Sequence, residues 1–134
     1  LARSSPGVGR AGESDAQSEQ LFAVLDHTVV LGYVEYTCSH NRAHIEWIAS
    51  WGREHGVSGI ANMLLAEVIR LCMHRKLKAV EARLVHRKCD PVWLLAAEQN
   101  LFNRHGFTNR YWIWDKDVIL YDIKLRLGDE GVDD

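Results

Sequence analysis

The chain carries two kinds of hydrophobic pattern, one after the other. Three apolar runs rich in β-branched residues come first, at Leu21–Asp26, Val29–Cys38 and Ala43–Ser50. Short polar segments separate these runs, which predicts strands joined by tight turns in an antiparallel meander. The period then changes to 3.6 residues over 60–72, where apolar side chains recur on one face. This change predicts an amphipathic helix of about 15 residues.

The second half of the chain alternates between strand and helix patterns. Leu77–Val85 alternates like a strand, and Trp93–Arg104 has helical composition and ends shortly before Gly106. Phe107–Trp114 and Val118–Leu125 follow as two more strands. The predicted order is therefore β-β-β-α-β-α-β-β. It indicates an α+β fold with a mixed, mostly antiparallel sheet and a βαβ unit at its centre.

The two ends differ in composition from the middle of the chain. Residues 1–20 are rich in Ser, Gly and Ala, so we expect a flexible N-terminal segment that buries little apolar surface. Residues 126–134 form a short acidic tail, which leaves 21–125 as the folded domain. The sequence begins with Leu rather than Met, and an excised or processed piece of a longer protein is one interpretation.

Composition excludes several classes of protein. At 134 residues, 47% hydrophobic and 25% charged, the chain has the profile of one globular domain. No apolar stretch approaches the ~20 residues of a membrane helix. The chain has a net charge of −2 and lacks the dense basic face of a nucleic-acid binder. Cys38, Cys72 and Cys89 are too few and scattered for a disulfide framework. We therefore expect reduced thiols, a cytoplasmic location, and no membrane or nucleic-acid partner.

The segment 51–61 holds the most informative chemistry. Gly56 and Gly59, with the small Ser58 between them, allow positive φ and close approach of a ligand to the backbone. The free N–H groups at the start of the following helix suit a phosphate, and Arg53 adds further donors. The spacing differs from G-x-x-x-x-G-K-[ST] and from G-x-G-x-x-G, which argues against those two nucleotide-binding loops. A plain turn with a helix cap is the simpler alternative.

Two motifs and the order of elements resemble one known family. Arg53–Ser58 reads R-x-x-G-x-[small], and Leu101–Phe107 reads L-[YF]-x-x-x-G-F. Both motifs, at this separation and in this order of strands and helices, resemble the GNAT superfamily of acyl-CoA-dependent N-acetyltransferases. The resemblance covers 21–125. It also marks this chain as a short member, without the N-terminal strand and two helices that GNAT proteins usually carry.

The resemblance implies a site for acetyl-CoA or another acyl-CoA as co-substrate. The loop and the helix start would bind the pyrophosphate, and pantetheine would lie between splayed strands near 45–50 and 82–86. Backbone N–H groups at Ile48–Ala49 would polarise the thioester carbonyl. No metal is implied. The implied cofactor-binding residues are Ile48, Ala49, Arg53, Glu54, His55, Gly56, Val57, Ser58, Gly59, Ile60 and Phe102.

Transfer to an amine needs a base, because an ordinary amine is protonated at neutral pH. His44 and Glu46 lie on the strand that leads into the loop, and strand alternation places both on the same face. They are the candidate catalytic residues, as a His–carboxylate pair or a water relay. A surface histidine and a carboxylate at a sheet edge or in a salt bridge are the simpler interpretations.

Some residues depart from the family pattern. Phe102 stands where many GNAT enzymes have a tyrosine that protonates the departing thiolate. Either CoA leaves as the thiolate, or Tyr33, Tyr36 or Tyr111 serves as the donor. A non-catalytic acyl-CoA-binding or interaction module is therefore the alternative function. The acceptor of the enzyme would be a small-molecule or peptide amine.

Other groupings of reactive residues are less specific. Cysteine and histidine at 72, 74, 86, 89 and 105 lack the paired spacing of a closed zinc site, so we expect no metal. Cys89 with His86 as a thiol nucleophile would lack an orienting third group. Trp51 and Trp93 lie where packing explains them poorly, and we expect one of them to stack on a ligand or a partner chain. An uncovered sheet edge makes a homodimer a further expectation.

Overall fold

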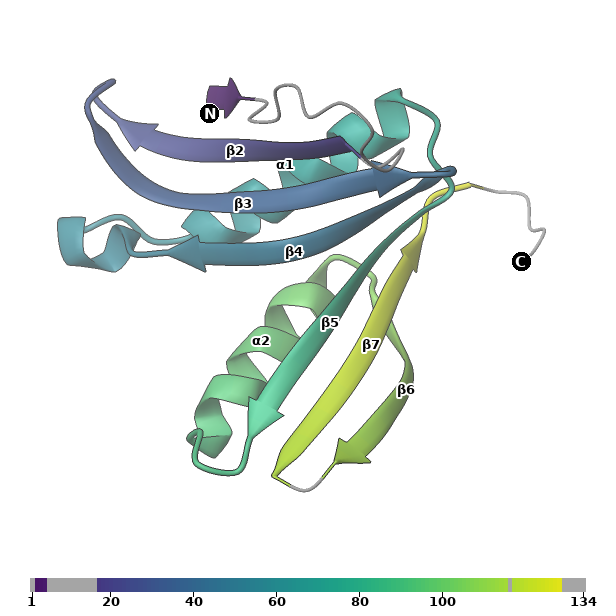
Figure 1. Cartoon of the computed structure of the whole chain (residues 1–134). Helices are drawn as coiled ribbons and strands as arrows, with labels where there is room; N and C mark the ends of the chain where they lie inside the picture. The colour runs from purple at the N-terminus through teal and green to yellow at the C-terminus, as the bar shows by residue number, and fades with distance from the viewer. Residues whose placement is uncertain (1, 5–16, 116, 129–134) are drawn as a thin grey trace.

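The computed structural model describes residues 2–4, 17–115 and 117–128 (Figure 1). It differs from the predicted order mainly by one additional short strand and a 3-10 helix. The elements are β1 (Ala2–Ser4), β2 (Gln17–Leu25), β3 (Val29–Ser39), β4 (Arg42–Ser50), η1 (Gly52–His55), α1 (Ile60–His74), β5 (Ala79–Arg87), α2 (Val92–Arg104), β6 (Thr108–Asp115) and β7 (Val118–Arg126).

All the strands of the described residues belong to one sheet, in the order β1-β2-β3-β4-β5-β7-β6. β4 and β5 are parallel, and every other neighbouring pair is antiparallel. The parallel pair is connected through α1, which is the predicted βαβ unit. The predicted α+β class, with a mixed and mostly antiparallel sheet, is therefore confirmed.

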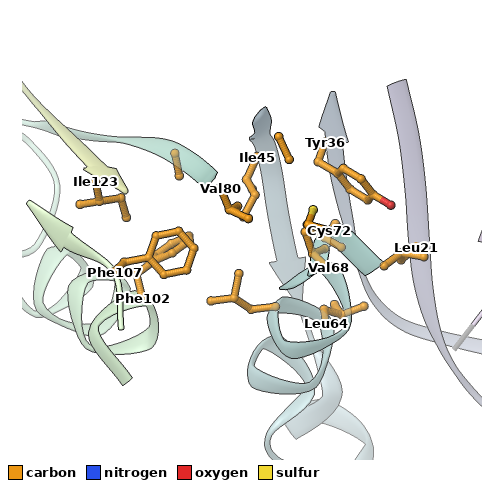
Figure 2. Packing of buried hydrophobic residues seen from close by; sticks show 14 of the residues in the cluster. Leu21, Tyr36, Ile45, Leu64, Val68, Cys72, Val80, Phe102, Phe107 and Ile123 are labelled. Atoms are coloured by element: carbon orange, nitrogen blue, oxygen red, sulfur yellow. The ribbon is translucent and has the colours of Figure 1, made fainter. Parts of the chain in front are cut away.

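The hydrophobic core lies between one face of the sheet and the two helices (Figure 2). Because strand side chains alternate, every second residue of a strand points to this face. Neither α1 nor α2 is long and apolar enough to cross a membrane. The core residues labelled in Figure 2 are Leu21, Tyr36, Ile45, Leu64, Val68, Cys72, Val80, Phe102, Phe107 and Ile123.

The parallel pair of strands is joined along only part of its length. Arg42–Ile45 pairs with Ala79–Ala82, and no pairing between β4 and β5 continues beyond these residues in the described chain. The two strands then diverge, as Figure 1 shows. Side chains along the diverging parts are open to solvent, with Trp47 57% exposed and Val85 43% exposed. The predicted splayed strands are thus present.

A β-bulge in β4 marks the start of this divergence. Glu35 pairs with Trp47 and Tyr36 pairs with Ile45, so Glu46 is an extra residue on β4. A bulge of this kind bends its strand and increases the local twist. Ile45 remains in the core, whereas Trp47 lies on the open face beside Glu35.

The expectation of a flexible segment over 1–20 is wrong at both ends of that segment. Ala2–Ser4 forms a strand antiparallel to β2, and β2 begins at Gln17 rather than at Leu21. The expectation that the chain has no N-terminal strand is wrong for the same reason. Backbone hydrogen bonding at a sheet edge extends these strands, and it leaves no hydrophobic pattern in the sequence. The rest of the predicted segment, 5–16, lies outside the described residues.

The other predicted boundary also shifts. β7 includes Arg126, and the Leu127 backbone N–H donates to the Lys78 carbonyl oxygen at 2.9 Å while its side chain packs against the core. The predicted acidic tail over 126–134 is therefore wrong at these first positions, because a core contact holds them. Residues 129–134 of that tail lie outside the described residues.

Candidate functional site

The connection from β4 to α1 is built around two glycines in left-handed conformation. Trp51 leads into η1, Gly56 follows with φ of 74°, and Gly59 has φ of 80° immediately before α1 begins at Ile60. L-amino acids with a side chain rarely adopt such φ values, whereas glycine adopts them readily. Gly56 and Gly59, the two glycines selected from the sequence, are thus the two left-handed positions of this loop.

A third glycine, Gly52, is required for a different reason. A Cβ atom at Gly52 would lie 2.6 Å from the Val57 carbonyl oxygen and 2.6 Å from Ile60 Cγ1. A Cβ atom at Gly32 in β3 would likewise lie 2.6 Å from the Ala49 carbonyl oxygen. The loop and the end of β4 are therefore packed backbone against backbone. The sequence analysis missed both positions, although a glycine inside the apolar run of β3 is a recognised sign of close backbone approach.

The start of α1 presents N–H groups for which the described part of the chain provides no backbone acceptor. Met63 donates to the Gly59 carbonyl oxygen at 3.0 Å, which is the first helical hydrogen bond. Within the described residues, no backbone acceptor is recorded for the amides of Ile60, Ala61 and Asn62. Gly59 supplies no side-chain cap, and the first turn contains no acidic residue. The helix dipole adds partial positive charge here, so this end of α1 suits an anion.

A cleft of about 670 Å³ opens beside the loop. Its walls come from the end of β4, the loop, the first turn of α1 and one face of α2. The α2 residues at 97, 100, 101 and 104 follow helical spacing, which is the signal that the sequence analysis left unused. The lining residues are Ser50, Trp51, Gly52, Arg53, Glu54, Val57, Ser58, Gly59, Ile60, Ala61, Asn62, Ala97, Glu98, Asn100, Leu101 and Arg104.

Apart from Phe102, the structure separates the predicted cofactor-binding residues into three groups. Arg53, Glu54 and the segment 57–60 line the cleft. His55 and Gly56 belong to the same loop but are exposed outside the cleft lining. Ile48 and Ala49 lie on β4, half-buried, in the part of the strand that has diverged from β5. The loop and the strand therefore form two adjoining parts of one region.

Phe102 is not part of the cleft wall. Its side chain is 2% exposed and packs edge to face on Phe107, with ring centroids 5.1 Å apart and an interplanar angle of 81°. Leu101, one position earlier on α2, lines the cleft instead. The expectation that Phe102 contacts the cofactor is corrected accordingly, because its position on the helix faces the core.

Charges of both signs surround the cleft. Arg53 and Arg104 contribute positive charge, and Glu54 and Glu98 contribute carboxylates. Burial raises the pKa of Glu98, and the negative charge of Asp90 raises it further. A carboxyl group with a raised pKa repels a nearby phosphate less strongly over the pH range in which it is partly protonated.

A hydrogen bond ties the two helical walls of the cleft together. His105 Nε2 lies 3.1 Å from Asn62 Oδ1, which joins the end of α2 to the first turn of α1. Burial lowers the pKa of His105, and the charge of Arg104 lowers it further. Both effects favour the neutral ring, whose Nε2–H donates to Asn62 in this arrangement.

The candidate base residues lie on the face of the sheet away from α1. His44 pairs with Thr37 across β3 and β4, and Thr37 Oγ1 donates to Glu46 Oε2 at 3.1 Å. The predicted common face is therefore present, although the bulge at Glu46 changes the local register. Within the described residues, no hydrogen bond is recorded between His44 and Glu46.

Aromatic side chains gather on the same face. The Phe22 and Tyr33 rings stack with centroids 5.8 Å apart, and Trp51 approaches the Tyr33 ring edge-on at 6.5 Å. Trp51 Nε1 donates to the Val30 carbonyl oxygen at 2.7 Å. These contacts explain the position of Trp51 by packing against the sheet. Trp93 is 68% exposed at the start of α2, so its predicted stacking on a ligand or partner stays a prediction.

The candidate tyrosine donors differ in their surroundings. The Tyr36 hydroxyl is buried and donates to Glu19 Oε1 at 2.7 Å, where Arg75 Nη2 also donates at 2.8 Å. Tyr33 is half-buried on the open face near Ala49, its cross-strand partner. The side chain of Tyr111 lies outside the described part of the structure.

The alternative metal and thiol sites depend on cysteines in different surroundings. Among the described residues, no three side chains of His, Cys, Asp or Glu are placed to hold a metal ion. Cys72 is fully buried, and this burial raises its pKa to about 12. Cys89 is exposed in the connection between β5 and α2.

Comparison with solved structures identifies the architecture. A protein from Desulfovibrio desulfuricans assigned to the GNAT acetyltransferase family superposes with a TM-score of 0.69 at 19% identity, over 83% of this chain and 69% of that one. The ribosomal-protein-S18-alanine N-acetyltransferase of Escherichia coli superposes with a TM-score of 0.63 at 15% identity, over 89% and 74%. The chain has the GNAT fold.

A further similar structure was solved with a bound ligand. A protein from Bacillus anthracis assigned as a streptothricin acetyltransferase, solved in complex with acetyl coenzyme A, superposes with a TM-score of 0.65 at 14% identity. The match covers 86% of this chain and 64% of that one. No family model and no curated protein matches the sequence.

Proposed function

We propose that this protein is an acyl-CoA-dependent N-acyltransferase that transfers an acyl group, most simply acetyl from acetyl-CoA, directly to an amine. One observation carries the proposal. The cleft at the start of α1 includes Ser50 at the end of β4, and among the described residues β4 is unpaired with β5 from Glu46 to that end, in a GNAT fold. An anion site and an unpaired strand edge thus adjoin, as a molecule with a pyrophosphate and an amide-containing arm requires.

The residues of the cleft suit the pyrophosphate of CoA. The amides of Ile60, Ala61 and Asn62 would donate to its oxygens, and Arg53 and Arg104 would balance its charge. The diverging edge of β4 would pair with the amide groups of pantetheine as an added strand does. This route would bring the acyl thioester to Ile48–Ala49, where backbone N–H groups polarise its carbonyl.

His44 and Glu46 would handle the proton of the amine. The acceptor nitrogen must lose a proton to become nucleophilic, and it then forms the new C–N bond as the C–S bond of the thioester breaks. Glu46 is the exposed residue of the bulge, and Thr37 orients its carboxylate. His44 is the cross-strand partner of the same threonine. One of the pair would take the proton directly or through water.

The sulfur of CoA leaves as a thiolate or takes a proton from a hydroxyl. Phe102 has no proton to give and lies in the core. Tyr36 is engaged with Glu19, whereas Tyr33 lies on the open face opposite Ala49. Tyr33 is therefore the donor that the described residues favour.

The buried Phe102 also favours a second candidate function. A GNAT fold without a proton donor at that position could bind acyl-CoA and not transfer the acyl group. Both functions predict that acetyl-CoA binds at the cleft, and only the first predicts release of free CoA when an amine is added.

The two functions are separated by measuring acetyl-CoA binding and CoA release on the same preparation. We expect an amine screen to yield free thiol with at least one acceptor. Glu46→Gln and His44→Ala should each lower kcat by about 10²-fold or more while acetyl-CoA affinity is retained. Tight acetyl-CoA binding without thiol release from any amine would refute the transferase and leave the binding module.

A double variant tests the loop itself. Gly56→Val with Gly59→Val introduces two β-branched residues at φ of 74° and 80°, and it should abolish acetyl-CoA binding. A Cβ atom at either position meets nothing within 4 Å, so the effect would come from backbone conformation and not from a clash. Normal binding by this variant would show that the loop is not the anion site.

A further inference from the structure

The face of the sheet opposite α1 and α2 carries charged residues in two different arrangements. On the β5 and β7 side, each acidic residue contacts a base. Glu81 accepts from Arg42 Nη1 at 2.9 Å and lies 3.9 Å from Lys124 Nζ, and Asp122 accepts from Arg83 Nε at 2.6 Å. These ion pairs cross strands and balance one another.

On the β3 and β4 side, the carboxylates have hydroxyl partners instead. Glu35 accepts from Ser18 Oγ at 3.1 Å, and Glu46 accepts from Thr37 Oγ1 at 3.1 Å. Within residues 2–4, 17–115 and 117–128, no lysine, arginine or histidine is recorded in an ion pair with either of them. This part of the face therefore carries negative charge that nothing recorded there balances.

An aromatic residue is the neighbour of both of these glutamates in the sheet. Trp47 pairs with Glu35 across the strands and follows Glu46 along β4. Its side chain is 57% exposed, even though indole burial is normally favourable. An indole face next to a carboxylate attracts an organic cation, because the ring quadrupole and the carboxylate act together.

We propose that Glu35 and Trp47 form a subsite for a second positive charge on the acceptor, so that the preferred acceptor is a diamine. The inference deepens the proposed function and rests on it for the identity of the reacting amine. One nitrogen of the acceptor would lie near Glu46 and lose its proton there. The other would stay protonated between the Glu35 carboxylate and the Trp47 ring.

The spacing of the strands suits a short aliphatic chain. Neighbouring strands lie about 4.8 Å apart, and successive residues rise about 3.4 Å along a strand. Glu35 and Glu46 are one strand and one residue apart, so their backbone positions are separated by about 6 Å. Two nitrogens at the ends of a four-carbon chain can reach both carboxylates, whose own side chains are flexible.

The test compares putrescine, with an amine at each end of a four-carbon chain, with butylamine, which has one. Calorimetric titration of the CoA-bound protein measures both affinities without requiring turnover. We expect putrescine to bind about tenfold more tightly than butylamine, because it adds one ion pair and one cation–π contact. Glu35→Gln and Trp47→Leu should each bring the two affinities close together while butylamine binding stays the same.

Glu67→Gln is the matched control, because it removes a carboxylate on α1 that pairs with Arg70. This variant should keep the full preference for putrescine. Equal affinity for the two amines in the unaltered protein, or an unchanged preference in Glu35→Gln, would overturn the subsite. Putrescine preference without any thiol release would instead retain the subsite and refute the transferase. Thiol release at equal efficiency from both amines would retain the transferase and refute the subsite.

Discussion

The two faces of the central sheet differ in burial, although the same strands form both. On the helix side, alternate residues of β2, β3, β4, β5 and β7 meet α1 and α2 in a closed apolar core (Figure 2). On the other side, no helix of the described residues covers the sheet, and aromatic, acidic and ion-paired side chains face solvent. Ile45 and Trp47 show the contrast within one strand, at 5% and 57% exposed.

From this contrast we infer that the helix side of the sheet stabilises the fold, whereas the open side carries the candidate base residues. The pairing of β4 with β5 ends at Ile45, and the same residue is the last of β4 that is buried in the core. Beyond it, the bulge at Glu46 and the divergence from β5 leave a strand edge free for a ligand. The core therefore fixes where the strands separate, and the open face can carry exposed functional groups at little cost in folding free energy.

Thiol reactivity should show the largest difference between the closed and the exposed parts of the molecule. Cys72 lies in the core with its pKa raised to about 12 by burial, and Cys89 is exposed. At pH 8 only about one Cys72 thiol in ten thousand is ionised, so we expect Cys89 to be alkylated at least a thousandfold faster. Peptide mass spectrometry after brief alkylation measures both sites. Comparable rates would show that the core is open.

Substitutions at Ile45 and Trp47 test the assignment of stability to one face. Ile45→Ala leaves a cavity under α1 and should lower the free energy of unfolding by about 2–5 kcal/mol. Trp47→Ala removes an exposed side chain and should change it by about 0.5 kcal/mol. Urea unfolding measures both values. A larger loss for Trp47→Ala would contradict the division between the faces.

Close backbone packing in the loop should matter more for binding than for folding. Gly52→Ala places a Cβ atom 2.6 Å from the Val57 carbonyl oxygen, so the loop must move. We expect the Kd for acetyl-CoA to rise about tenfold, which corresponds to about 1.4 kcal/mol of binding free energy, because the loop shifts to relieve the overpacked contact. Gly128→Ala is the control, because a Cβ atom there meets nothing within 4 Å. Equal Kd values in calorimetry for the two variants would refute a role for Gly52.

The smallest expected effect concerns the carboxylate inside the cleft. Burial raises the pKa of Glu98, so this group ionises at a higher pH than an ordinary glutamate, and each gain of negative charge opposes a bound pyrophosphate. Acetyl-CoA affinity should therefore fall as pH rises through that pKa. Glu98→Gln should remove this dependence and tighten binding about threefold at pH 7. Titrations across pH that are parallel for the two proteins would show that Glu98 lies away from the phosphates.

The sequence predicts the parts of this fold that depend on periodic burial. The helix at Ile60–His74 and the strands around it follow from apolar spacing, because one face of each must be buried. β1 has no such pattern, since Ala2–Ser4 is held by backbone pairing at the sheet edge. The bulge at Glu46 is equally invisible in the sequence, because it depends on the register between two strands.

The candidate site was predictable to a similar extent. The positive φ of Gly56 and Gly59 could be anticipated from the residue type and the adjoining helix. The contribution of α2 to the cleft could not, because its approach to the loop depends on how two helices pack on a twisted sheet. Phe102 illustrates the limit, since a motif fixes its place in the sequence and its helix face decides that it packs in the core.

Mapping acetyl-CoA onto the backbone amides tests the central claim most directly. We would titrate isotope-labelled protein with acetyl-CoA and follow each amide by NMR. The account predicts that the largest shifts fall on Gly59–Asn62 and on the α2 residues Asn100 and Arg104, with smaller shifts along the diverging part of β4. Saturable binding that leaves the amides of Gly59–Asn62 unshifted would contradict it.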